Sequence, residues 1–285
     1  MIITDLILIL ISLTALIFAT IVDIRIKEVP DWITYGLIAS AISIRLLHSI
    51  IFTDWLYLIH GLLGLGITYL AGSILYHIKQ WGGGDAKLLM GLGTALATKP
   101  SYLPNSAIPF LLTLFIYIII IGAIYGIICS IYLTLKNINK FSFEFKTLLK
   151  SGQSSIIITI SLLASIALII SIFFIDILKI KIMLLILAIL LALYFYLFVA
   201  IKSVENIFFY KKVSPDKLVE GDWLASDVKI RKKTILNKKT ILEKQHILEL
   251  QKLNIKKVLI KEGIPFVPPF LIGTIIAILI GNPFF

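Results

Sequence analysis

The chain has 285 residues, of which 59% are hydrophobic and 15% are charged, and its mean hydropathy is +1.01. A soluble globular protein of this size cannot bury that much apolar surface, because folded domains still leave much of their area in water. The composition therefore excludes a soluble enzyme and indicates a polytopic membrane protein. The net charge of +11 is compatible with binding to nucleic acid or to a membrane surface. The single cysteine, Cys129, excludes an intrachain disulfide and a cysteine-cluster metal site.

Eight stretches of the sequence are candidates for transmembrane helices. A hydrocarbon core needs about 20 apolar residues in helical conformation. Six stretches carry no charge: residues 6–22, 55–78, 100–135, 151–175, 182–201 and 263–285. A seventh, residues 32–53, has Arg45 near its far end, where we expect the long side chain to reach the interface. The eighth, residues 88–98, is long enough only if its helix starts at Gly82–Asp85, which places a carboxylate at the membrane boundary.

The distribution of cations predicts the orientation of the chain. The loops after the first, third, fifth and seventh predicted spans contain 23 of the 27 Lys and Arg residues; they are residues 23–31, 78–87, 136–150 and 202–262. Because cytoplasmic loops are enriched in Lys and Arg, we expect these loops in the cytoplasm and the N-terminus outside the cell membrane. Residues 202–262 alone hold 15 cations and 8 anions, so most of the positive charge reflects orientation.

We predict an all-α polytopic membrane protein of about eight transmembrane helices with a small α+β cytoplasmic module. The expected domains are a transmembrane core over residues 1–202, a basic cytoplasmic module over 203–264 and the last transmembrane helix over 265–285. Within the module, Thr240–Leu253 has apolar residues at helical spacing, and Lys256–Ile260 is typical of a strand. Residues 136–150 mix phenylalanines with lysines, which favours an amphipathic segment on anionic lipid over an ordinary loop. The sequence has no nucleic-acid-binding motif, so we expect the basic module to contact lipid.

Two acidic residues stand where a membrane protein rarely keeps them. Asp23 ends the first apolar run, and Asp85 follows the glycines Gly82–Gly84. Each alone could be a solvated interfacial residue, but both fall at the cytoplasmic ends of predicted helices and therefore at similar depth. Two carboxyl groups that share a site cannot both ionise readily, so the pair would hold one proton. The ionised group can take a proton from water, and the protonated group can hydrogen-bond a carbonyl under attack.

This chemistry is peptide hydrolysis without a metal, a cofactor or a nucleophilic side chain. Gly82, Gly83 and Gly84 lack a Cβ atom, so their backbone could approach an extended substrate closely; a simple turn is the alternative. Pro265, Pro268 and Pro269 precede or open the last span. They could shape a substrate groove, or they could mark an ordinary helix start.

The segment WGGGDAKLLMGLG resembles the GxGD signature of the type IV prepilin peptidases and the archaeal preflagellin peptidases. The family pattern G-x-G-D-x-K-x-x-x-x-x-G is matched by Gly82, Gly84, Asp85, Lys87 and Gly93. The first catalytic aspartate of that family ends the first helix, before a short basic turn with a proline. The residues that resemble this segment are Asp23, Arg25, Lys27 and Pro30, and the tail Glu262–Gly273 resembles the segment before the last helix of archaeal members.

The resemblance implies a membrane aspartic endopeptidase that cuts a short basic leader from pilin or archaellin precursors at the cytoplasmic face. Asp23 and Asp85 would be its catalytic pair. Bacterial members commonly add a four-cysteine zinc region and methyl transfer, which a chain with one cysteine does not support. Asp31 stands where the family more often has asparagine, so Glu28 and Asp31 are candidates to attract the leader's cations. The candidate substrate-binding residues are Gly82, Gly83, Gly84, Glu28, Asp31 and Lys87.

Two other functions remain open from the sequence. A transporter or channel could use two intramembrane carboxylates as ion or proton ligands. Against it, the sequence shows no inverted repeat, and both aspartates lie at the same end of their helices. A scaffold protein with inactive aspartates is the third possibility. Cleavage of a leader-bearing precursor by membranes that contain the protein would separate the three.

Overall fold

The computed structural model describes residues 2–282 apart from 105, 107, 176, 219–220, 231–232, 239, 254 and 262. The side chains of residues 2, 153–155, 229–230 and 233–234 are also outside the description. The chain forms two compact units, one of Met1–Ile127 with Gly263–Phe285 and one of Ile128–Glu262. One boundary, after Ile127, falls inside a helix, and the other precedes Gly263, whereas the sequence placed domain boundaries at 202 and 264. The sequence-based domain division therefore stays a prediction.

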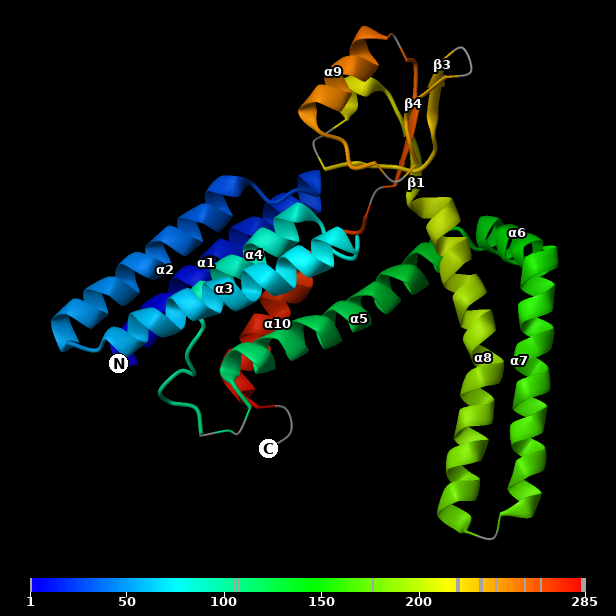
Figure 1. The fold of residues 1–285 in the computed structure, drawn as a ribbon, viewed down its shortest axis with the longest axis horizontal. Coiled ribbons are helices and arrows are strands. Elements are labelled where there is room, and N and C mark those ends of the chain that lie inside the picture. The colour runs from blue at the N-terminus through cyan, green and yellow to red at the C-terminus, as the bar shows by residue number, and fades with distance from the viewer. Residues whose placement is uncertain are drawn as a thin grey trace. The chain divides into compact units, whose positions relative to one another are not determined.

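The first unit is a bundle of helices built from the apolar runs of the sequence (Figure 1). Its helices are α1 (Ile2–Ile26), α2 (Asp31–Phe52), α3 (Trp55–His77), α4 (Gly83–Ala95), the first part of α5 (Phe110–Lys136), and α10 (Val267–Ile280). The turn after α1 begins at Lys27, which adopts a left-handed conformation with φ 59°, as a residue after a helix C-terminus commonly does. Helix α4 begins at Gly83, which confirms the predicted start at Gly82–Asp85.

Helices α3 and α4 approach closely because glycines line their contact. A Cβ atom added to Gly64 would overlap the carbonyl oxygen of Gly93 and lie 2.7 Å from Ala97 Cβ. A Cβ atom on Gly72 would lie 3.1 Å from the carbonyl oxygen of Ala86. Small residues allow such a close approach of backbones in membrane helices. There, van der Waals packing drives helix association, because lipid tails are themselves apolar. The glycines therefore fix the position of α4, which carries Asp85.

Arg45 contradicts the prediction that its side chain reaches the interface. The side chain is 0% exposed, and its guanidinium donates hydrogen bonds to the carbonyl oxygens of Thr94 and Ala95, each at 2.9 Å. It also donates to the carbonyl oxygen of Tyr57 at 2.8 Å, and it lies 4.5 Å from the centroid of the Tyr57 ring. Thr94 and Ala95 belong to the last turn of α4, whose carbonyl groups lack partners within the helix. Arg45 therefore caps the C-terminus of α4, and its hydrogen bonds to three carbonyl oxygens compensate for the burial of its charge.

The second unit combines an antiparallel helix pair with two small sheets (Figure 1). After the end of α5 come α6 (Ile138–Leu149), α7 (Gly152–Ser171) with a 3₁₀ turn η1 (Ile172–Phe174), and α8 (Leu178–Phe208). The polar segment that follows contains β1 (Tyr210–Val213), η2 (Pro215–Lys217), β2 (Trp223–Leu224), β3 (Val228–Ile230), β4 (Lys233–Leu236), α9 (Lys244–Lys252) and β5 (Val258–Lys261). Helix α9 and strand β5 fall on the segments predicted as helix and strand.

Strand β5 is the centre of the larger sheet, whose order is β1-β5-β2 with antiparallel pairs. Tyr210 pairs with Lys261 and Val213 with Val258, while β3 and β4 form a separate antiparallel hairpin. A small apolar core joins these strands to α9; its buried residues include Leu224, Leu242, Leu250 and Ile260.

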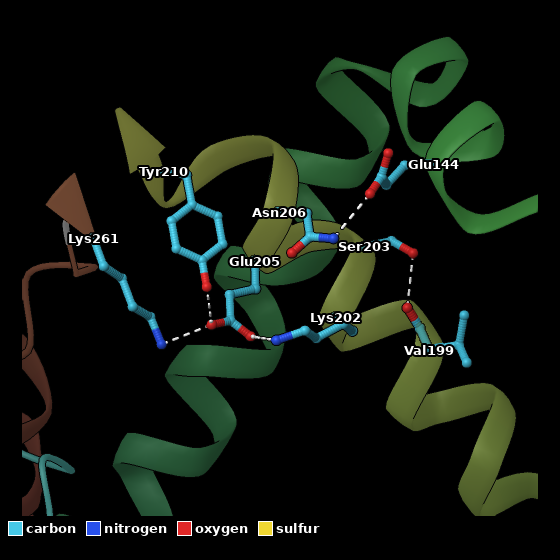
Figure 2. Close-up of polar contacts among 8 residues, drawn as sticks. All are labelled: Glu144, Val199, Lys202, Ser203, Glu205, Asn206, Tyr210 and Lys261. Atoms are coloured by element: carbon cyan, nitrogen blue, oxygen red, sulfur yellow. Dashed lines mark hydrogen bonds and ion pairs between the residues drawn. The ribbon is translucent and has the colours of Figure 1, made fainter. Parts of the chain in front are cut away.

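A cluster of polar contacts attaches this segment to the end of α8 (Figure 2). Glu205, in the last turn of α8, accepts a hydrogen bond from Tyr210 at 3.2 Å and forms ion pairs with Lys261 at 2.7 Å and Lys202 at 3.3 Å. The next residue, Asn206, donates to Glu144 of α6 at 2.9 Å. Because Lys261 ends β5, these contacts hold the first and last strands of the segment against α8.

Six helices in the described part of the chain are long and apolar enough to cross a membrane: α1, α2, α3, α5, α7 with η1, and α8. They correspond to six of the eight predicted spans. The other two predicted spans contain α4, with 13 residues, and α10, with 14, and residues 283–285 lie outside the description. At about 1.5 Å per residue, each of these two helices is by itself shorter than a core of about 30 Å. The chain is a helical membrane protein, and the count of eight spans stays a prediction.

Candidate active site

Asp23 lies in the last turn of α1 and is buried, with 5% of its surface exposed. Its Oδ2 atom accepts a hydrogen bond from the backbone N–H of Val267 at 2.9 Å. Val267 is the first residue of α10, and the free N–H groups at a helix N-terminus attract carboxylates. Pro268 and Pro269 follow at positions where a helix tolerates residues without an N–H. The prolines therefore mark a helix start, and the donor to Asp23 comes from a residue 244 positions along the chain.

Asp85 lies in the first turn of α4, outside the six candidate spans. Gly82 precedes the helix in an extended conformation, and its N–H donates to Asp85 Oδ2 at 3.2 Å. Burial, and to a smaller extent the nearby charge of Asp23, raise the pKa of the Asp85 carboxyl to about 7, against the opposing effect of the hydrogen bond from the Gly82 N–H. The two carboxyl groups are therefore close enough to interact electrostatically.

This arrangement has a defined chemical capacity. Two interacting carboxyl groups titrate as one pair, so over an intermediate range of pH the pair holds a single proton. One group is then a proton acceptor for water, and the other is a proton donor for a carbonyl oxygen. Both groups sit at the ends of helices that the glycine contacts and the Val267 hydrogen bond hold in place.

The three glycines before Asp85 differ in their surroundings. A Cβ atom on Gly84 would lie 2.9 Å from Val29 Cβ, so its bare backbone packs against the turn between α1 and α2. A Cβ atom on Gly83 would meet only Tyr76, at an ordinary distance of 3.6 Å. Gly82 positions its N–H for Asp85. The structure therefore gives Gly82 and Gly84 local packing and capping roles, and their contact with a substrate stays a prediction.

The charged residues near the pair are partly engaged with each other. Lys87 Nζ and Asp31 Oδ1 form an ion pair at 2.6 Å, and Lys87 lies 5.5 Å from the centroid of the Tyr35 ring. This contact joins the start of α2 to the first turns of α4. Glu28 is exposed in the turn between α1 and α2. The charge of Asp31 is therefore balanced by Lys87. The sequence did not indicate this ion pair.

Two groups at the site were missed by the sequence. The N–H of Val267 carries no signal in a sequence, because any residue except proline offers one. Trp81, directly before Gly82, is 6% exposed, and its ring packs on phenylalanines from α5 and α10. The only feature of the sequence that could have indicated Trp81 is the position of a large aromatic residue directly before the glycines Gly82–Gly84.

Comparison with known proteins bears on the first unit. Residues 10–127 match the family model described as the type IV leader peptidase family. The chain is 27% identical over 128 residues to a preflagellin peptidase of Methanocaldococcus jannaschii, covering 43% of this chain and 54% of that protein. It is 32% identical over 84 residues to a preflagellin peptidase of Methanococcus maripaludis, covering 30% of this chain and 36% of that protein. The chain thus spans about half or less of the length of these relatives. No solved structure matches it significantly.

Proposed function

Because residues 10–127 match the model of the type IV leader peptidase family, we propose that this chain is a membrane aspartic endopeptidase. Its substrates are type IV pilin-like or archaellin precursors, from which it removes a short basic leader peptide. Two relatives named preflagellin peptidase support this class of substrate. The matched segment contains both Asp23 and Asp85.

In this reaction Asp23 accepts a proton from a water molecule as the water oxygen attacks the carbonyl carbon of the scissile peptide bond. Asp85 donates its proton to the carbonyl oxygen, which yields a tetrahedral diol. Proton transfer from Asp23 to the leaving nitrogen then accompanies cleavage of the C–N bond, and Asp85 recovers its proton. The raised pKa of Asp85 supports its role as the group that carries the proton.

The observation that carries the proposal is the placement of two interacting carboxyl groups at the ends of two different helices, Asp23 bound by the N–H of Val267 and Asp85 by the N–H of Gly82. The test is to replace each separately, as Asp23→Asn and Asp85→Asn, and to assay leader removal from a precursor in membranes. We expect each change to reduce cleavage by about 10²–10⁴-fold, since each removes one acid–base group. Asp54→Asn is the matched control, because Asp54 precedes α3 and its side chain makes no cap hydrogen bond there. Full activity of either variant at the pair would refute the mechanism.

We propose further that the site faces the cytoplasm and that Glu28, Asp31 and Lys87 contribute to binding the leader. The positive-inside distribution of Lys and Arg supports this orientation. The exposed turn that contains Glu28 adjoins the site and offers an anion to a basic leader. Exchange of the ion pair between Lys87 and Asp31 for a contact with a leader cation would keep Asp31 compensated.

The features of helix α6 support a further proposal, that this chain contacts the anionic lipid headgroups of the membrane. It follows the candidate span α5 and precedes the candidate span α7, so a helix of 12 residues between them stays at one face of the membrane. Lys140, Lys146 and Lys150 are exposed, and so is Phe143. Exposed cations and an aromatic side chain beside two spans are typical of a segment at the lipid headgroups.

A further inference from the structure

Three segments that are far apart in the sequence meet at Trp81. Its ring centroid lies 5.1 Å from that of Phe270 and 5.9 Å from that of Phe266, both at the start of α10. On the side of α5 it lies 6.1 Å from Phe115. All three separations are within the range of favourable aromatic pairs. Trp81 therefore connects the segment before α4 to the beginning of α10.

Phe266 is itself held in place by α5. A Cβ atom on Gly122 would lie 2.6 Å from Phe266 Cζ, so the ring occupies the space that the glycine leaves open. Phe266 directly precedes Val267, whose N–H binds Asp23. Any displacement of Phe266 would therefore move the hydrogen-bond donor of Asp23.

The two carboxyl groups depend on different anchors. Asp85 is bound to the N–H of Gly82, one residue after Trp81, and Asp23 is bound to the N–H of Val267, one residue after Phe266. Trp81 and Phe266 pack directly on each other. The aromatic contact is thus a short physical link between the anchors of the two acids, independent of the covalent chain that joins α1 to α4.

We propose that Trp81 is a positioning residue that holds the start of α10, and with it Asp23, in register with Asp85. The catalytic role of the two aspartates rests on the proposed function. The packing of Trp81 on Phe266, which links the anchors of the two acids, does not depend on that function. Packing of Trp81 against Phe266 and Phe270 sets the separation of the acids, and an indole ring fills this space better than a smaller side chain.

The structural link can be tested without a substrate by hydrogen exchange of the full-length protein in detergent. Between Gly263 and Phe270, residues 265, 268 and 269 are prolines, so the amide hydrogens belong to Ile264, Phe266 and Val267. Trp81→Ala should accelerate exchange in this segment toward the level of Asp23→Ala, which removes the acceptor. Trp32→Ala, at a side chain that is 70% exposed on α2, should leave exchange unchanged.

The positioning role is tested by leader cleavage with the same variants. A misplacement of about 1 Å can cost about 100-fold in turnover. We therefore expect Trp81→Ala to lower kcat by about this factor with KM nearly unchanged, and Trp81→Phe to restore most of both activity and exchange protection. If Trp81→Ala does not fold, Phe266→Leu probes the same contact from α10, with the same expected outcome.

The outcomes separate the two proposals. Exchange and kcat that match the wild type in Trp81→Ala, or in Phe266→Leu, would overturn the positioning role. If wild-type protein and the Asp23 and Asp85 variants show equal cleavage, the proposed function fails, whereas the exchange result still decides whether Trp81 holds α10.

Discussion

Replacement of Gly64 by alanine tests whether the backbone contact of α3 with α4 sets the position of Asp85. The added Cβ atom would meet the carbonyl oxygen of Gly93, which cannot rotate away, and would lie 2.7 Å from Ala97 Cβ, where 3.4–4 Å is an ordinary contact. Helices α3 and α4 would have to separate by about 1 Å to relieve this overlap. Gly66→Ala is the matched control, because Gly66 lies on the same helix with nothing within 4 Å of its Cβ position.

The size of the effect follows from two opposing contributions. Alanine favours a helix over glycine by about 1 kcal/mol, and both variants share this gain. Overpacking of a tight contact costs about 1–3 kcal/mol, and only Gly64→Ala incurs this cost. The difference in free energy of unfolding between the two variants should therefore be about 1–3 kcal/mol, with Gly64→Ala the less stable.

The assay is reversible unfolding of the purified protein in mixed micelles with SDS, combined with leader cleavage. Because α4 carries Asp85, a shift of about 1 Å should also reduce turnover of Gly64→Ala by about 100-fold, and Gly66→Ala should retain wild-type turnover. Equal stability and equal activity of the two alanine variants would show that α3 and α4 do not make this contact.

Two further predictions concern buried charge and pH. Arg45→Met should lower the free energy of unfolding by roughly 3 kcal/mol or more, because it leaves the carbonyl groups of Thr94, Ala95 and Tyr57 without their donor, at about 1–3 kcal/mol each; an SDS unfolding curve that matches the wild type would contradict the capping role. Asp85 has a pKa of about 7 in the folded chain against an ordinary 3.8, so the folded state binds this proton more tightly. The resulting stability is fully present below about pH 3.8 and is lost progressively as the pH rises through about 7. Wild-type protein should therefore lose more stability than Asp85→Asn between pH 5 and pH 8, and leader cleavage should decline above about pH 7; parallel stability curves for the two proteins would refute this assignment.

The sequence was most informative where one short segment carries both structure and chemistry. The glycines before Asp85 and the apolar run after it predicted a helix that starts within Gly82–Asp85, and α4 begins at Gly83. The apolar runs likewise predicted the six long helices. The low charged fraction of the chain made Asp23 and Asp85 conspicuous, although no pattern in the sequence measures their separation.

The features that escaped prediction depend on contacts between distant segments. Arg45 looked like a residue at the end of an apolar run, and only the fold brings the last turn of α4 to its guanidinium. Asp31 looked like a free anion, and only packing of α2 beside α4 supplies Lys87. The Val267 N–H is chemically like other backbone N–H groups until the fold places it at Asp23. Such contacts follow from tertiary packing, which local periodicity does not encode.

The hydrogen bond between Val267 and Asp23 has a consequence for biosynthesis. A ribosome makes Asp23 near the beginning of the chain and Val267 near its end, with the whole polar segment of the second unit between them. A nascent chain that has completed residues 10–127 already contains both acids, but it lacks the donor that holds one of them. This hydrogen bond can therefore form only when translation has reached α10, and a chain released earlier would carry both carboxyl groups without it.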